Sequence, residues 1–327
     1  MLIIESYLIM DRIVYYLYYA FINIFRIVPF WLLYLKSSFL YFVLYHLVGY
    51  RKSVVIDNLT KCFPDKSEKE IMQLAKRFYK ENLSDIFVEG LKGFTMTEKH
   101  FKTRYKVLNP EILDKYFNQG QDVLAIATHY GNWEWGIQVF NNQVKHQAAA
   151  LYKPLTNKYI EEYSKSLREK SGIHLVSIRD TLEYFQKKKD KPVIYIMAAD
   201  QFPGGKALDK AVTVNFLGRE TLCLHGPESY ARYNKLPTFF FDVKRVKRGH
   251  YTLEIKLLAD KPYELEKGEL TKRYMKNLEQ AIYREPQNWL WSHKRWKNEN
   301  FKKEDNTEKK AKVYISAQRC AAIYTQK

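Results

Sequence analysis

Apolar residues dominate a long stretch within the first 50 positions of the chain. Arg26, Pro29 and Lys36 divide it into three apolar runs. A membrane-spanning helix requires about 20 mostly apolar residues, and the window 13–29 nearly provides them. Arg26 lies near one end of this window, where a long cationic side chain can reach the membrane interface. The following stretch, 30–49, predicts either a second span or a helix lying in the interface, where Tyr and Trp are favoured.

The residues that flank this stretch indicate its orientation and its class. Arg51, Lys52 and Lys61 follow it, and positive charge beside a span marks the cytoplasmic side. A secretory signal peptide is disfavoured because the stretch is too long and lacks a small-residue cleavage site. We therefore predict a membrane anchor, with a buried pair of amphipathic helices in a soluble protein as the alternative.

Beyond position 58 the pattern changes to short apolar runs that alternate with amphipathic stretches. Short apolar runs bounded by polar residues are typical of buried strands, and a 3.6-residue period predicts helices. Ser67 and Glu70 form a capping box before the first such helix. Alternating strands and helices predict an α/β fold, a sheet flanked by helices. Predicted strands occupy 122–127, 147–152, 174–178, 192–199, 211–216, 236–243 and 251–258, with a hairpin turn at 247–250. Predicted helices occupy 71–89, 157–170, 226–234 and 269–284.

Composition divides the chain into three parts. Residues 1–52 are predicted to form the membrane anchor, of one span or two apolar helices, and residues 53–300 the α/β domain. Residues 301–327 are charged and then weakly patterned, which predicts a flexible tail. Met1 and Met10 are both candidates for the true start, because the segment between them adds little to the pattern.

The charge balance is strongly basic, with 54 Lys and Arg residues against 36 Asp and Glu residues and a net charge of +18. Such a balance favours an anionic partner, and nucleic acid, anionic lipid and acidic proteins all qualify. Nucleic acid is disfavoured because the basic residues are spread over the chain and no RNA- or DNA-binding motif occurs in context. Cys62, Cys223 and Cys320 are far apart, so neither a zinc site nor a disulfide framework is predicted. We expect no metal ion and no cofactor.

The strongest candidate for chemistry is a histidine and a carboxylate around a predicted strand-to-helix turn. His129 follows the first predicted strand, Gly131 permits a sharp turn, and Asn132 is a favourable N-cap for the helix that begins after it. Ligand sites in open α/β sheets lie at the carboxyl ends of strands. With the turn between them, Glu134 can reach back and orient His129 as a general base. The helix N-terminus offers backbone N–H groups to a developing oxyanion.

The competing interpretation is that His129 is a hydrogen-bonded core histidine and that Glu134 only stabilises the helix N-terminus. The strand and turn context favours the catalytic interpretation. A serine hydrolase is disfavoured because the Gly-x-Ser-x-Gly motif is absent, and no cysteine lies near His129 in the sequence. The reaction is therefore predicted to have no covalent enzyme intermediate, with His129 activating an external hydroxyl.

Five motifs, in order along the chain, resemble those of one enzyme family. His-x4-Glu after a buried strand resembles the first motif of the lysophospholipid (glycerolipid) acyltransferase superfamily. The surrounding residues are similar to its lipid A late-acyltransferase branch, the lauroyl and myristoyl transferases. The likeness covers about residues 13–300. The motifs are His129-Tyr130-Gly131-Asn132-Trp133-Glu134, Tyr152-Lys153-Pro154, Ala199-Asp200-Gln201, Phe216-Leu217-Gly218 with Gly226-Pro227, and Trp289-Leu290-Trp291-Ser292-His293-Lys294-Arg295-Trp296-Lys297.

This resemblance implies a fold, a reaction and a location. The fold is a glycerolipid-acyltransferase-like sheet flanked by helices, with an N-terminal membrane-associated helical segment. The reaction moves a fatty acyl chain from an acyl thioester, carried on acyl carrier protein, to a hydroxyl of an anionic lipid acceptor in lipid A biosynthesis. The location is the cytoplasmic face of the bacterial inner membrane, and the cell is Gram-negative.

The motifs also imply residues that support the catalytic pair. Four residues are expected to bind substrate, stabilise the oxyanion or otherwise support the site: Asn132, Lys153, Asp200 and Gln201. Because Lys153 and Asp200 each follow a predicted strand, we expect both in the cleft of His129. The family usually has Arg at the position of Lys153, and Lys keeps the charge without the bidentate fork. Three residues are expected to contact lipid or donor: His293, Arg295 and Trp296.

Alternatives stay open at this point. Lys153 could be a surface lysine, Asp200 a turn-forming residue, and the last motif a structural aromatic corner. The same catalytic pair could activate water and hydrolyse an acyl thioester. The acceptor could be a lysophospholipid or an aminolipid, and the acyl chain length is not readable. The non-enzymatic alternatives are a basic nucleic-acid-binding protein and a membrane scaffold.

Overall fold

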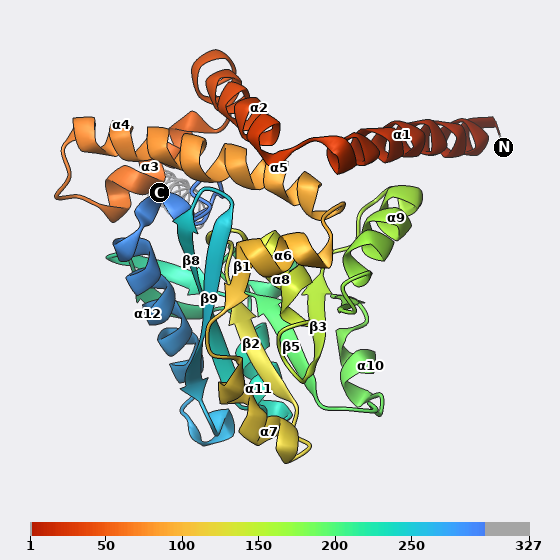
Figure 1. The fold of residues 1–327 in the computed structure, drawn as a ribbon. Helices are drawn as coiled ribbons and strands as arrows, with labels where there is room; N and C mark the ends of the chain where they lie inside the picture. Colours follow the sequence, from red (N-terminus) through yellow and green to blue (C-terminus); the bar gives the residue numbers. More distant parts are fainter. Residues whose placement is uncertain (1, 298–327) are drawn as a thin grey trace, which may run out of the picture.

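A layer of helices covers one edge of an α/β body in the computed structural model, which describes residues 2–297 (Figure 1). Two π-helical turns interrupt this layer, at Val43–Leu47 after α2 and at Phe78–Leu83 before α5. The layer consists of α1 (Leu2–Ile27), α2 (Phe30–Phe42), α3 (Lys52–Cys62), α4 (Glu68–Arg77) and α5 (Ser84–Gly93).

Among the described residues, seven strands form one mixed sheet in the order β1-β9-β8-β2-β5-β3-β4. β2 runs parallel to β5 and β8, and β3 runs parallel to β5, so the carboxyl ends of β2, β3 and β5 lie at the same edge. β6 (Val212–Phe216) and β7 (Arg219–Cys223) form a separate antiparallel pair. The sheet strands are β1 (Tyr105–Val107), β2 (Val123–Ala127), β3 (Gln147–Tyr152), β4 (His174–Ser177), β5 (Val193–Ala198), β8 (Thr238–Lys247) and β9 (His250–Ala259).

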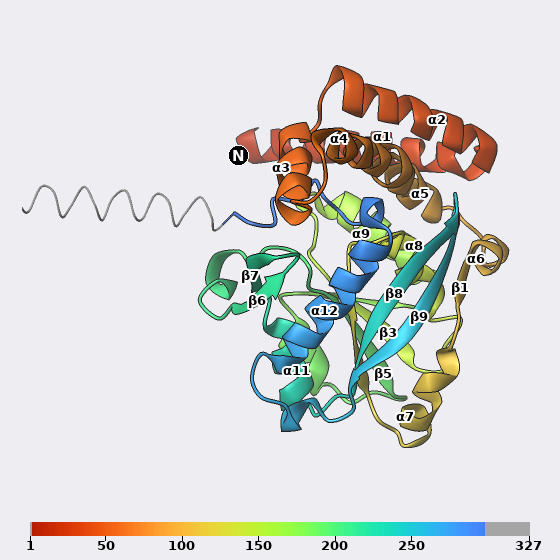
Figure 2. The same cartoon turned by 90° about the vertical axis from the view of Figure 1, so that its left-hand side faces the viewer.

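Helices cover both faces of the sheet (Figure 2). Phe241 of β8 packs on Phe140 of α8, whereas Phe240 packs on Tyr274 of α12. Because successive side chains of a strand point to opposite faces, α8 and α12 lie on opposite faces. The helices of the body are α6 (Glu98–Arg104), α7 (Asp114–Asn118), α8 (Trp133–Phe140), α9 (Lys158–Glu169), α10 (Thr181–Gln186), α11 (Gly226–Tyr233) and α12 (Glu269–Arg284).

The predicted fold class is confirmed, since the structure is a sheet flanked by helices. Each predicted strand is present, and β3 and α12 have the predicted bounds. The capping box is present as well: the Glu70 N–H donates to Ser67 Oγ, and the Ser67 N–H donates to Glu70 Oε2. The predicted helix 71–89 is divided by a π-helical turn. Helix α3 and the short elements β1, β7, α6, α7 and α10 were not predicted.

The two apolar helices at the N-terminus make different contacts. α1 packs on α9 through tyrosines, among them Tyr15, Tyr19 and Tyr163. α2 packs on α5 through polar contacts: Ser37 Oγ donates to Asp85 Oδ1 at 2.6 Å. One described helical stretch, Phe30–Leu47, is long and apolar enough to cross a membrane. The predicted window 13–29 falls mainly in α1, which ends at Ile27.

Both helices leave large apolar side chains exposed. α1 and α2 belong to the helical layer, which Figure 1 shows along one edge of the α/β body. We call these exposed side chains together the exposed apolar surface of α1 and α2. They include Ile13, Tyr16, Leu17, Phe21 and Ile24 of α1 and Trp31, Leu35 and Phe39 of α2. The predicted tail, 301–327, lies outside the described residues.

Candidate active site

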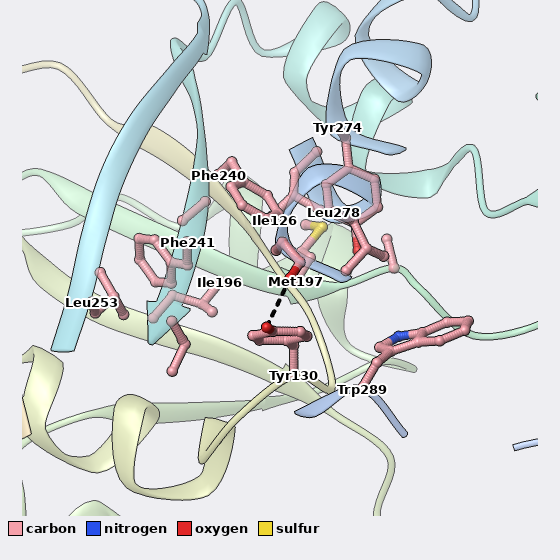
Figure 3. Close-up of a cluster of buried hydrophobic side chains, with 14 of the residues drawn as sticks. Ile126, Tyr130, Ile196, Met197, Phe240, Phe241, Leu253, Tyr274, Leu278 and Trp289 are labelled. Atoms are coloured by element: carbon pink, nitrogen blue, oxygen red, sulfur yellow. Dashed lines mark hydrogen bonds between the residues drawn. The ribbon is translucent and has the colours of Figure 1, made fainter. Parts of the chain in front are cut away.

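His129 lies just beyond the carboxyl end of β2, in a tight turn that leads into α8. Gly131 adopts a left-handed φ of +60° in this turn. Asn132 is the N-cap of α8, because its Oδ1 accepts the Trp135 N–H at 2.9 Å. The buried Tyr130 hydroxyl donates to the Ala281 carbonyl of α12 at 2.8 Å, and its ring belongs to the apolar cluster of Figure 3. The sheet and two helices therefore fix the backbone that carries His129.

The carboxylate that contacts the imidazole of His129 is that of Asp200. The His129 Nδ1 lies 2.7 Å from Asp200 Oδ1, and the His129 backbone N–H donates to Oδ2 at 3.0 Å. The two residues are 71 positions apart, but β5, which precedes Asp200, pairs with β2. The Trp289 indole N–H also donates to Oδ2, at 2.9 Å. Asp200 is thus a buried carboxylate with three donors around it.

These contacts set the charges of the pair. Burial by itself raises the pKa of Asp200, but the charge of His129 and the hydrogen bonds to the carboxylate lower the pKa to about 2. Burial by itself lowers the pKa of His129, while the charge and hydrogen bond of Asp200 and the charge of Glu134 raise it overall. Asp200 is therefore ionised at neutral pH. The accepting carboxylate at Nδ1 favours the tautomer that leaves Nε2 as the basic nitrogen.

Gln201 and His293 complete the surroundings of the imidazole. Gln201 Nε2 lies 3.3 Å from His129 Nε2, on the side where a substrate proton would be taken up. His293 Nε2 accepts the backbone N–H of Phe202 at 3.0 Å, which holds the turn that carries Asp200 and Gln201. Burial lowers the pKa of His293 to about 4, so His293 is neutral and able to accept this bond at neutral pH.

Glu134 does not make the contact predicted for it. Its carboxylate forms an ion pair with Arg168 of α9, with Oε2 and Nη2 3.0 Å apart, and no described hydrogen bond joins it to His129. The reason is geometric: the N-cap turn starts α8 at once, and the first helical turn directs Glu134 toward α9. The charge of Glu134 still raises the pKa of His129 through space.

The two other residues predicted to support the site have different surroundings. Lys153 follows β3 and is exposed at the same sheet edge as His129 and Asp200. Its place in the cleft of His129 stays a prediction. Asn132 is fully buried, and besides capping α8 its Nδ2 donates to Glu89 Oε2 at 2.7 Å. Asn132 therefore shapes the turn.

Two residues predicted to contact lipid or donor lie inside the protein. Arg295 is 1% exposed and donates to the Leu222 carbonyl at 2.7 Å. The Trp296 indole is buried and donates to Thr221 Oγ1 at 2.7 Å. A lipid contact needs an accessible side chain, so the structure does not favour that role for either residue. Both side chains hold residues 289–297, which we call the C-terminal segment, against β7.

Sequence reasoning missed three residues at the site. Trp289 was part of a quoted motif, but nothing in the sequence indicated its bond to Asp200. Arg168 lies in a polar helix without a motif. Glu89 of α5 is fully buried and accepts hydrogen bonds from the side chains of Tyr34, Asn132 and Tyr251. Burial and the nearby Asp85 raise the pKa of Glu89 to about 7.

A narrow, almost wholly apolar crevice begins beside the turn that carries His129. It runs between α8 and the sheet, behind Thr128 and Trp133, and is lined further in by Ile137, Ile196 and Leu253. The crevice suits an acyl chain by its chemistry. Admission of a long chain requires side chains such as Trp133 to move, because the space is small in this structure.

Gly131→Ala should destabilise the protein and lower any activity of the site. A Cβ at this position would lie 2.8 Å from Val243 Cγ1, and the φ of +60° is unfavourable for alanine. We expect the free energy of unfolding to fall by about 1–3 kcal/mol, measured by denaturant unfolding. Gly204→Ala is the matched control, since nothing lies within 4 Å of a Cβ there. Equal stability of the two variants would contradict this account of the turn.

Comparison with known proteins gives one family match. The model of the bacterial lipid A biosynthesis acyltransferases matches residues 4–298, nearly the whole chain. A search of curated proteins found no significant match. The matched region includes the turn of His129, the turn of Asp200 and the segment that carries Trp289 and His293.

Proposed function

The chain belongs to the bacterial lipid A biosynthesis acyltransferase family, and on this premise we propose that it transfers a fatty acyl chain from a thioester donor to a hydroxyl of an anionic lipid acceptor. The observation that carries the proposal is the pair formed by His129 and Asp200 at the sheet edge beneath the exposed apolar surface of α1 and α2. A base at that place can meet a lipid hydroxyl.

The proposed step uses His129 as general base. Its Nε2 takes the proton from the acceptor hydroxyl while the hydroxyl oxygen attacks the thioester carbonyl. Asp200 holds the imidazole and stabilises the imidazolium that forms. The tetrahedral oxyanion lies near the N-terminus of α8, whose partial positive charge is favourable. Collapse breaks the carbon–sulfur bond, and the imidazolium returns the proton to the leaving thiolate.

Acyl carrier protein is the proposed carrier of the donor. It is strongly acidic, and the chain carries a net charge of +18, so opposite charges would steer the encounter. Lys153, exposed at the catalytic edge, is proposed to contact phosphate of the donor or acceptor. Glu134 and Arg168 border the same edge, and we propose that Glu134 supports the positive charge of His129 during the step.

A transfer assay with purified full-length protein tests this function. We expect ester formation with an acyl carrier protein thioester plus lipid acceptor, and slower transfer from the coenzyme A thioester of equal chain length. Transfer from the carrier protein should weaken as ionic strength rises from about 0.1 M toward 1 M, because screening shortens from about 10 Å to 3 Å. Release of free fatty acid with no ester would indicate a thioester hydrolase instead. A preference for coenzyme A without salt dependence would favour general lysophospholipid acylation.

We further propose that the protein acts at the cytoplasmic face of the inner membrane, held there by α1 and α2. Trp31, Leu35 and Phe39 recur at a spacing of four along α2 and are 70%, 62% and 69% exposed. Their joint replacement by serine should lower the membrane-bound fraction at least about tenfold, since each apolar side chain contributes roughly 1.5–3 kcal/mol when buried. Fractionation of cells measures this.

The matched control changes exposed apolar side chains on other elements. Leu182 of α10 and Tyr233 of α11 are 58% and 84% exposed. Their replacement by serine should leave the membrane-bound fraction unchanged. An unchanged membrane-bound fraction of the α2 variant would contradict the anchoring proposal.

A further inference from the structure

A second pocket, with a volume of about 280 Å³, opens between the start of α3 and the C-terminal segment. Four cationic side chains and one carboxylate line it. The four cations are Lys61, Arg219, Lys294 and Lys297, and the carboxylate is Asp57. None of these residues takes part in the catalytic contacts described above.

The cations of the pocket differ in how firmly they are held. Lys61 forms an ion pair with Asp57, with 2.8 Å between Nζ and Oδ1. The Arg219 guanidinium lies over the Trp296 ring, 3.9 Å from its centroid, and Trp296 is fixed by its bond to Thr221. Stacking fixes the plane of a guanidinium, which is the arrangement that suits bidentate contact with a phosphate.

Lys294 and Lys297 supply the charge that no described partner neutralises. Both side chains are exposed, and neither forms an ion pair with another residue in the 2–297 range. An anionic ligand in the pocket could therefore be met by a fixed Arg219 and by two adaptable ammonium groups.

Two elements that line the pocket, α3 and the segment around Lys294, also contact residues of the catalytic site. Lys294 follows His293, which holds the turn of Asp200 and Gln201 through the Phe202 N–H. Asn58 of α3, another lining residue, donates to the His293 carbonyl at 3.0 Å. α3 in turn belongs to the helical layer that carries the exposed apolar surface (Figure 2). A lipid whose hydroxyl meets His129 would thus have a basic pocket beside it.

We propose that this pocket binds a phosphate monoester on the headgroup of the acceptor lipid, and so selects phosphorylated acceptors. The proposal rests on the proposed acyl transfer. Phosphate is also present in the donor, in the prosthetic group of a carrier protein or in coenzyme A. The test must therefore separate the affinity for the acceptor from the affinity for the donor.

The test compares the wild-type enzyme with the Lys294→Ala/Lys297→Ala variant in steady-state transfer assays. One acceptor is the phosphorylated lipid, and the other is the same lipid after phosphatase treatment. For the variant we expect the KM of the phosphorylated acceptor to rise about tenfold or more, because two charge-assisted contacts are lost. The kcat, the KM of the donor and the KM of the dephosphorylated acceptor should stay within about threefold of wild type.

Two further variants keep the test informative. Lys294→Arg/Lys297→Arg retains the charge and should restore the KM of the phosphorylated acceptor. Lys188→Ala/Lys191→Ala removes two exposed lysines before β5, at the opposite edge of the sheet, and should change nothing. A raised KM of the donor alone, or no change in any KM, would overturn the proposal. Absence of transfer by the wild-type enzyme would instead refute the proposed function.

Discussion

Replacement of His129 should abolish most acyl transfer: we expect the kcat of His129→Ala to fall by about 10²–10⁴. The imidazole is the group whose basic nitrogen faces Gln201 and whose other nitrogen is held by Asp200. Without it, the acceptor hydroxyl must lose its proton to water. The measurement is single-turnover ester formation with saturating acceptor, which isolates the chemical step from binding.

The control for this variant must address folding as well as activity. His129→Ala removes one hydrogen-bond donor from the buried carboxylate of Asp200, which can destabilise the fold. His129→Asn is the better comparison, because its side-chain amide can still donate to that carboxylate. His174→Ala removes an exposed histidine at the start of β4 and should be active. A well-folded His129→Asn enzyme with near-normal turnover would rule out His129 as the base.

Asp200→Asn should lower the kcat by about 10²–10⁴ as well, in line with the loss of an orienting carboxylate in a histidine-based site. An amide cannot stabilise the imidazolium, and it can hold the imidazole in the wrong tautomer. Asp122→Asn is the matched control, because Asp122 also accepts a backbone N–H and a side-chain hydroxyl, but lies next to the amino end of β2. Equal activity of the two variants would contradict the role assigned to Asp200.

The pH dependence distinguishes this role from a loss of structure. The base must be neutral, so activity should rise with pH through the pKa of His129, which lies above its ordinary value of about 6.5. Since the charge and hydrogen bond of Asp200 raise that pKa, Asp200→Asn should move the midpoint to lower pH. Glu134→Gln should move it in the same direction by less, because Glu134 raises the pKa less. An unmoved midpoint in Asp200→Asn would argue for a merely structural effect.

Elements with strong local signals could be predicted from the sequence. α12 has a clear amphipathic period, and the helix of residues 68–77 begins at the capping box that predicted it. Asn132 caps α8 as its position indicated. β1 and β7 were missed because three to five residues carry too little pattern. β1 becomes a strand by pairing with the distant β9, whereas β7 pairs with its neighbour β6.

The site shows where local reasoning stops. His129 and Asp200 were both selected from the sequence, yet their contact was not, because it depends on β5 lying next to β2. Glu134 was paired with His129 because it is near in sequence, whereas the start of α8 turns it toward Arg168. Likewise, the exposed and the packed faces of α1 could not be told apart, since the tyrosines that contact α9 are as apolar as those that face outward.

The contacts between α2 and α5 bear on how the N-terminal helices can be exchanged. Ser37 and Tyr34 donate to Asp85 and Glu89, and Arg248 donates to the carbonyl of Tyr34. Through Glu89 the same group of side chains reaches Asn132, the cap of the helix behind His129. The N-terminal helices therefore also contribute hydrogen bonds to the α/β domain and cannot be exchanged without loss of these bonds. Grafting an unrelated transmembrane segment in their place would restore the location but leave two buried carboxylates without these donors.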